Sequence, residues 1–119
     1  MIKKVVYLLL VSVFLINFSA CSLMQKPIDK RTGFFDYLKQ TESNIRNEEW
    51  DKARDNLENS EKAWKKVKPL FQIDIDHDYV NSLEENLIKL EGYIETKEKG
   101  ESLATILLVK DTWENIGSL

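Results

Sequence analysis

The chain has 119 residues, of which 43% are hydrophobic, with 17 basic and 20 acidic side chains and a net charge of −3. This length suffices for one small domain and excludes two domains of ordinary size. Residues 33–119 hold 12 of the basic and 19 of the acidic side chains, a local net charge of −7. Because that charge repels nucleic-acid phosphates, we expect no nucleic-acid partner.

The N-terminal region has the pattern of a secretion signal. Residues 3–4 are lysines, residues 5–16 are an uncharged apolar run, and small residues at 19–20 lead to Cys21, the only cysteine. A basic end, an apolar stretch of about twelve residues and small residues before the cut are typical of a secretory signal peptide. A cysteine directly after the small pair resembles the lipobox of bacterial lipoproteins. We therefore expect residues 1–20 to be a lipoprotein signal peptide and Cys21 to be lipidated.

An uncleaved anchor is the alternative. Residues 5–24 contain no charged side chain and are long enough to cross a bilayer as one helix, and Phe18 stands where a lipobox most often has leucine. Both alternatives place the remaining chain on the extracytoplasmic face of the cell membrane, held by lipid on Cys21 or by a single N-terminal transmembrane anchor. Residues 21–32 then form a tether, and residues 33–119 form the folded domain.

From Gly33 onward, apolar residues recur at helical spacing in four segments. The first segment's predicted core stripe comprises Phe34, Leu38, Thr41 and Ile45. The second segment's stripe comprises Trp50, Ala53, Leu57, Trp64 and Val67, and the third segment's stripe comprises Val80, Leu83, Leu87, Leu90 and Ile94. Asn47 is the predicted N-cap of the second helix, Pro69 its predicted stop, and Gly100 the predicted stop of the third.

The fourth segment, from about Ser102, is apolar around most of its circumference. Its predicted core stripe comprises Ile106, Val109, Trp113 and Ile116. Leu103, Leu107 and Leu108 add apolar surface to that stripe, and a helix that is apolar on most sides is either central to the fold or covered by something else. We therefore predict that these three leucines bind a partner.

Four amphipathic segments with short connections predict an all-α fold, an antiparallel bundle of four helices after the N-terminal signal or anchor helix. The bundle would consist of two helical hairpins. Residues 45–67 loosely resemble the step inside a tetratricopeptide hairpin, without that repeat's Gly and Tyr. The two hairpins show no convincing sequence period and are fewer than a solenoid needs.

Residues 74–78, Asp-Ile-Asp-His-Asp, are the strongest chemical candidate. With Glu85 they imitate the ligand spacing of an EF-hand, but Tyr79 stands where the loop needs glycine and Asn81 where it needs an apolar residue. We expect no metal, and expect Asp74 or Asp76 to cap a helix. His77 falls on the extrapolated core stripe and is expected to be structural. Without a nucleophile elbow or phosphate loop, the sequence predicts no catalytic residue, no cofactor and no enzyme.

Several spaced residues resemble a known family. Trp50 and Trp64 stand fourteen apart, followed by Ile-Asp-His at 75–77, by Leu90 with Tyr-Ile at 93–94, and by the apolar last helix. Together they resemble the bacterial family called domain of unknown function 4363. The resemblance implies a small, helical, envelope-exposed protein without an established activity. It also implies a multi-pass membrane protein as partner, since such proteins are often encoded beside family members.

The preferred function is a membrane-tethered, non-enzymatic helical module that binds another envelope protein through the surface around residues 103–109 or through an acidic face. The alternative is a carrier of a small apolar ligand or peptide, in a cavity among Trp50, Trp64, Trp113 and the fourth helix. Burial of Ala104 and Leu108 distinguishes these alternatives, since their exposure favours a partner.

Overall fold

The computed structural model describes residues 1–12, 32–71 and 77–116. Within these ranges the protein is all-helical, with five helices and no strand. A first helix covers residues 2–12. It is followed by α2 (Phe34–Arg46), α3 (Trp50–Phe71), α4 (His77–Glu95) and α5 (Lys99–Ile116).

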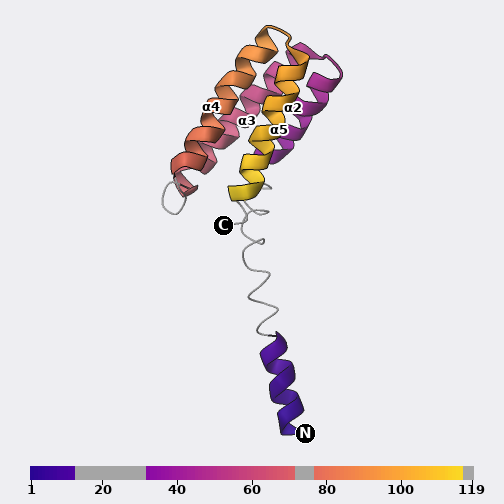
Figure 1. The fold of residues 1–119 in the computed structure, drawn as a ribbon, viewed down its shortest axis with the longest axis vertical. Coiled ribbons are helices and arrows are strands. Elements are labelled where there is room, and N and C mark those ends of the chain that lie inside the picture. Colours follow the sequence, from indigo (N-terminus) through magenta and orange to yellow (C-terminus); the bar gives the residue numbers. More distant parts are fainter. Residues whose placement is uncertain (13–31, 72–76, 117–119) are drawn as a thin grey trace.

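Helices α2 to α5 lie side by side around one core (Figure 1). Helix α2 packs against α3 and α5, and α4 packs against α5 and α3, so each helix contacts two neighbours. The contacts within the pairs α2–α3 and α4–α5 are more extensive than those between the pairs. This difference follows from the short connections inside each pair, residues 47–49 and 96–98.

The predicted core stripes of the first and third segments are confirmed, because every residue in them is buried. The predicted α5 stripe is likewise buried, and Ser102 and Thr105 join it. In α3 one prediction was wrong: Trp50 is only half-buried, while Ser60 and Ala63 are buried. Trp50 is the first residue of its helix, where the neighbouring helices cover it less completely.

The helix ends differ from the predicted ones. Asn47 is the C-cap of α2, not the N-cap of α3. The next residue, Glu48, takes the left-handed conformation (φ 55°), and the Glu48 and Glu49 N–H groups donate to the Ile45 and Asn44 carbonyls. These paired bonds form a Schellman motif, which satisfies carbonyls at a helix end without requiring glycine.

The same motif ends α4. Lys97 has φ 57°, and the Lys97 and Glu98 N–H groups donate to the Ile94 and Tyr93 carbonyls. Gly100, the predicted stop, is the second residue of α5. Sequence reasoning missed this turn because its left-handed position holds lysine, whereas glycine is the usual signal.

Pro69 does not end α3, which continues to Phe71. A proline removes one backbone donor and normally destabilises a helix interior. Here the two extra residues place Phe71 against the aromatic core, with its ring 5.4 Å from that of Trp113 and 6.5 Å from that of Trp64. These contacts favour continuing the helix past Pro69.

The two helix pairs share one register, at a period of 49 residues that was not recognised in the sequence. Every buried position of the first pair except Ala63 falls on a buried residue of the second, as in Leu38 to Leu87, Ile45 to Ile94, and Trp64 to Trp113. Helices α2 and α4 end at equivalent residues, and α3 and α5 begin at equivalent residues. The period was hidden because identical residues are few while burial and turn geometry are shared.

Candidate functional site

The outward face of α5 carries the predicted partner-binding residues. Leu107 is 46% exposed and Leu108 is 55% exposed. Ala104, between them on the helix surface, is also exposed, whereas Leu103 is partly buried and packs against the core. We call these four residues the α5 apolar face. Ala104 and Leu108 are thus both exposed, the outcome that favours a partner over an internal role.

The internal repeat shows that the fold does not require this apolar face. Shifting its four residues back by 49 gives polar positions on α3, namely Arg54, Asp55, Glu58 and Asn59. The two helices occupy equivalent places, so the packing accommodates polar side chains there. Leu103 packs against the core, but Ala104, Leu107 and Leu108 are exposed. Exposed apolar side chains that the fold does not require are a feature of binding surfaces.

Acidic side chains border the α5 apolar face. Glu101, Asp111 and Glu114 are exposed on the same helix. The helix has two lysines: Lys110 pairs with Glu42 of α2 at 3.1 Å between Nζ and Oε1, and Lys99 lies 3.9 Å from Glu48, from Nζ to Oε2. The Lys110 Nζ also lies 5.7 Å from the Phe35 ring centroid. Both lysines of α5 thus pair with glutamates that lie outside this acidic border.

The three tryptophans do not share one cluster. Trp64 and Trp113 pack edge to face, with ring centroids 6.5 Å apart, and both contact Phe34 at 5.7 and 4.8 Å. Both indoles are almost fully buried. Trp50 instead lines a shallow hollow with residues 48–49, 51–52 and Lys97. The predicted cavity among all three tryptophans therefore does not correspond to one place in the structure.

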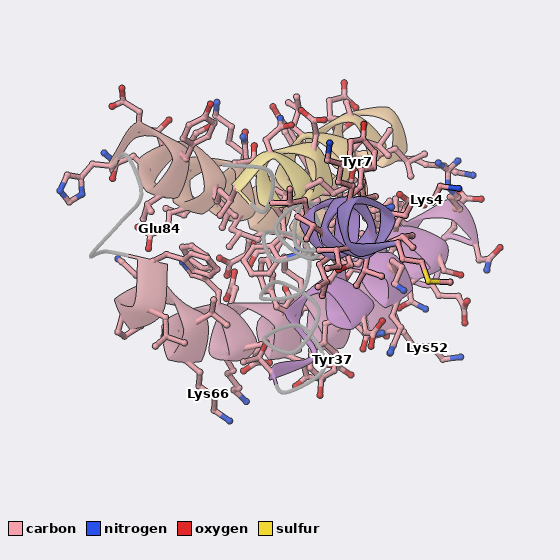
Figure 2. All side chains as sticks on the ribbon, turned by 90° about the horizontal axis from the view of Figure 1, so that it is seen from below. Lys4, Tyr7, Tyr37, Lys52, Lys66 and Glu84 are labelled. Atoms are coloured by element: carbon pink, nitrogen blue, oxygen red, sulfur yellow. The ribbon has the colours of Figure 1, made fainter. Side chains whose placement is uncertain are left out.

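Beside the aromatic core, Trp64 and Lys68 of α3 form a polar contact with Glu84 of α4. The Trp64 Nε1–H donates to Glu84 Oε1 at 3.0 Å, and Lys68 Nζ lies 2.6 Å from the same carboxylate. Figure 2 shows Glu84 on the side of α4 that faces α3. The hydrogen bond from Lys68 lowers the pKa of Glu84 against the opposing effect of desolvation. This network satisfies the indole donor and is structural.

The seams between the helix pairs differ in charge at equivalent positions. Lys110 pairs with Glu42 across α5 and α2, and the 49-residue shift replaces these residues by Glu61 and Glu91 across α3 and α4. Desolvation and the charge of Glu91 raise the pKa of Glu61, with a smaller opposing effect from Lys65. The α3–α4 seam thus contains a repulsion where the α2–α5 seam contains an ion pair.

We predict that Glu61→Lys stabilises the protein at pH 7, by about 0.5 to 1 kcal/mol, because it recreates the Lys110–Glu42 arrangement. The melting temperature should rise by several degrees, measured by circular dichroism. The reciprocal Lys110→Glu should lower it.

The raised pKa of Glu61 also predicts how this stabilisation depends on pH. Because its folded-state pKa is raised, Glu61 contributes stability below its ordinary pKa, and that contribution is lost as pH rises through the raised pKa. The stabilisation by Glu61→Lys, relative to the unchanged protein, should therefore be larger at pH 7 than at pH 4. An equal effect at both pH values would contradict this assignment.

The acidic motif gives no site in the described part of the chain. Asp74 and Asp76 lie outside the described residues. His77 is the first residue of α4 and is exposed, so its predicted place on the core stripe was wrong; the buried stripe begins at Val80. Among residues 1–12, 32–71 and 77–116, no three His, Cys, Asp or Glu side chains gather as metal ligands.

The membrane-attachment residues fall largely outside what the structure describes. Cys21 lies outside the described residues. So do residues 21–31 of the predicted tether and residues 13–24 of the predicted anchor. In the described ranges, no helix combines the length and apolar character needed to cross a bilayer. Lipidation and the alternative anchor both stay predictions.

The described residues thus define a small all-helical protein with two helix pairs in one register and an apolar face on its last helix. A family model, domain of unknown function (DUF4363), matches residues 28–119. The match covers more than half of the chain, so the protein belongs to this family, as its spaced aromatic residues indicated. Comparison with curated proteins and with solved structures gave no match.

Proposed function

We propose that this protein is an envelope lipoprotein that acts as a non-enzymatic helical interaction module. Lipid on Cys21 would hold it at the extracytoplasmic face of the cell membrane, with residues 21–32 as tether. In this proposal α2–α3 and α4–α5 form two hairpins of an antiparallel bundle, loosely tetratricopeptide-like, that presents α5. The expected partner is another envelope protein, such as a multi-pass membrane protein.

The α5 apolar face is the observation that supports this function best. Leu107 and Leu108 are about half exposed, and their equivalents on α3 are Glu58 and Asn59. Exposing apolar surface to water costs free energy, about 25 cal/mol for each Å² that a partner would otherwise cover. Because the fold accepts polar side chains at these positions, the leucines are better explained by binding than by packing.

The alternative, a carrier of an apolar ligand, has less support. The rings of Trp64 and Trp113 pack against each other and against Phe34 and Phe71, so they fill the space between the helices with their own atoms. Trp50 lies among charged turn residues instead. These contacts favour a structural role for the aromatic cluster.

Site-specific photo-crosslinking in intact membranes tests the proposed function. A photoreactive amino acid at Leu108 of the full chain should form a crosslink to another envelope protein, identified by mass spectrometry. The same group at Asn59, the equivalent position on α3, should give no such product. Cys21→Ser should remove the lipid label, which tests the lipid attachment separately from the crosslink.

Substitution gives the corresponding loss of function. Leu108→Glu should abolish co-purification of the crosslinked protein while leaving helicity and melting nearly unchanged. Ile88→Glu is the matched control, since Ile88 is an apolar residue 70% exposed on α4, and it should leave capture intact. Crosslinking at Asn59 as strong as at Leu108, or capture that survives Leu108→Glu, would exclude α5 as the binding surface.

A further inference from the structure

We propose that the partner segment docked on α5 is a single amphipathic helix whose apolar stripe is flanked by lysine or arginine. The inference rests on the proposed function and adds the chemistry of the partner. It follows from the extent of the α5 apolar face, from the charges at its border, and from comparison with the equivalent face of α3.

The extent of the face suits one helix. Its residues, 103 to 108, cover less than two turns, which is about 8 Å along the helix axis. A stable interface in solution usually buries about 800 Å² on each partner, far more than four side chains, one of them alanine, can supply. A second copy of this chain, held at the same membrane, is disfavoured because it would bring its own acidic border against this one. A single helix fits, and confinement to one membrane raises its effective concentration.

The charges beside the α5 apolar face indicate which charges should flank the apolar stripe of the partner helix. Glu101, Asp111 and Glu114 are exposed beside the apolar face. The two lysines of α5 pair with glutamates outside this border, Lys110 with Glu42 and Lys99 with Glu48. Like charges brought together across an interface are unfavourable and opposite charges steer association. Basic flanks therefore complement this border.

The repeat shows that the border charge is not fixed by folding. The positions equivalent to Glu101, Asp111 and Glu114 on α3 are Lys52, Lys62 and Lys65. The same places in the fold thus accept either sign. The acidic sign on α5 coincides with the apolar face, whereas α3 combines basic residues with a polar face. This coincidence indicates that both properties of α5 serve one binding surface.

Two synthetic helical peptides test the inference, with identical leucine stripes and with either lysine or glutamate flanks. Full-chain protein in phosphatidylcholine nanodiscs is titrated against each labelled peptide by fluorescence anisotropy, and empty nanodiscs give the background. The lysine-flanked peptide should bind about tenfold more tightly than the glutamate-flanked one, a difference of about 1.4 kcal/mol. The preference should shrink as salt is raised, since the border is exposed.

Charge reversal completes the test. The double variant Asp111→Lys with Glu114→Lys should invert the preference while keeping its helicity, because the repeat already places lysines at the equivalent positions. Lys62→Glu with Lys65→Glu on α3 is the matched control and should leave the preference unchanged. Absence of binding to either peptide, equal binding of both, or a preference that survives charge reversal would overturn the inference.

These outcomes separate the inference from the proposed function. If Leu108 crosslinks to an envelope protein in membranes but the peptides show no charge preference, the docking function stands and the basic-flanked helix is wrong. If the crosslinked product is a second copy of this chain, the inference is also wrong, because the border of that copy is acidic. If Leu108 forms no crosslink at all, the proposed function fails first.

Discussion

Leu87→Glu should unfold the protein, whereas Ile88→Glu, one residue further along α4, should leave it folded. Leu87 is 4% exposed and belongs to the core, while Ile88 is 70% exposed. An unpaired carboxylate in an apolar interior costs several kcal/mol. The whole stability of a domain this small is of the order of 5 to 10 kcal/mol. A surface substitution usually changes stability by less than about 0.5 kcal/mol.

Circular dichroism of the two full-chain variants in mild detergent measures this difference. The Leu87→Glu protein should lose most of its helical signal or its cooperative melting, and the Ile88→Glu protein should melt like the unchanged chain. Cooperative melting of Leu87→Glu near the unchanged temperature would mean that α4 does not pack as described. The pair also provides the stability reference for Leu108→Glu, which should behave like Ile88→Glu.

Helical periodicity predicted the core of this protein well, for a physical reason. Burial in a four-helix arrangement repeats every three or four residues, so Val80, Leu83 and Leu87 reveal their face without knowledge of the neighbouring helices. The same reasoning identified Leu107 and Leu108 as residues outside the α5 stripe, and both are exposed. The sequence alone therefore shows when a helix carries more apolar residues than its buried stripe needs.

Helix ends were predicted less well because their usual signals were absent or misleading. The left-handed residues Glu48 and Lys97 carry side chains that give no hint of a positive φ. Pro69 suggested a stop, but the contacts of Phe71 extend the helix past it. His77 was assigned to the core by extrapolating the α4 period one turn beyond its buried part.

The 49-residue register was missed because it is a relation of environments more than of residue types. Thr41 corresponds to Leu90, and Ser60 corresponds to Val109, although all four are buried. Only the structure shows that these positions are equivalent. Once the register is known, the two halves can be compared position by position. Leu108 corresponds to Asn59 and Lys110 corresponds to Glu61, so the fold does not require an apolar residue at the first position or a cation at the second.

Trp64→Ala should lower the free energy of unfolding by about 3 to 5 kcal/mol, as large core truncations do. The indole is 3% exposed, packs against Phe34, Phe71 and Trp113, and donates to Glu84 at 3.0 Å. Its removal leaves a cavity between α3 and α4 that these large rings fill only partly.

Two further variants separate the ring from its hydrogen bond, measured by urea unfolding of the full chain followed at 222 nm. Trp64→Phe keeps most ring contacts and loses the donor to a carboxylate, so it should cost about 1 to 3 kcal/mol. Trp50→Ala truncates a half-buried ring outside the aromatic cluster and should cost less than Trp64→Ala. If Trp50→Ala proves the more damaging, the stability of the fold depends on the turn end, where Trp50 lies beside the two Schellman motifs, more than on the ring cluster between the two helix pairs.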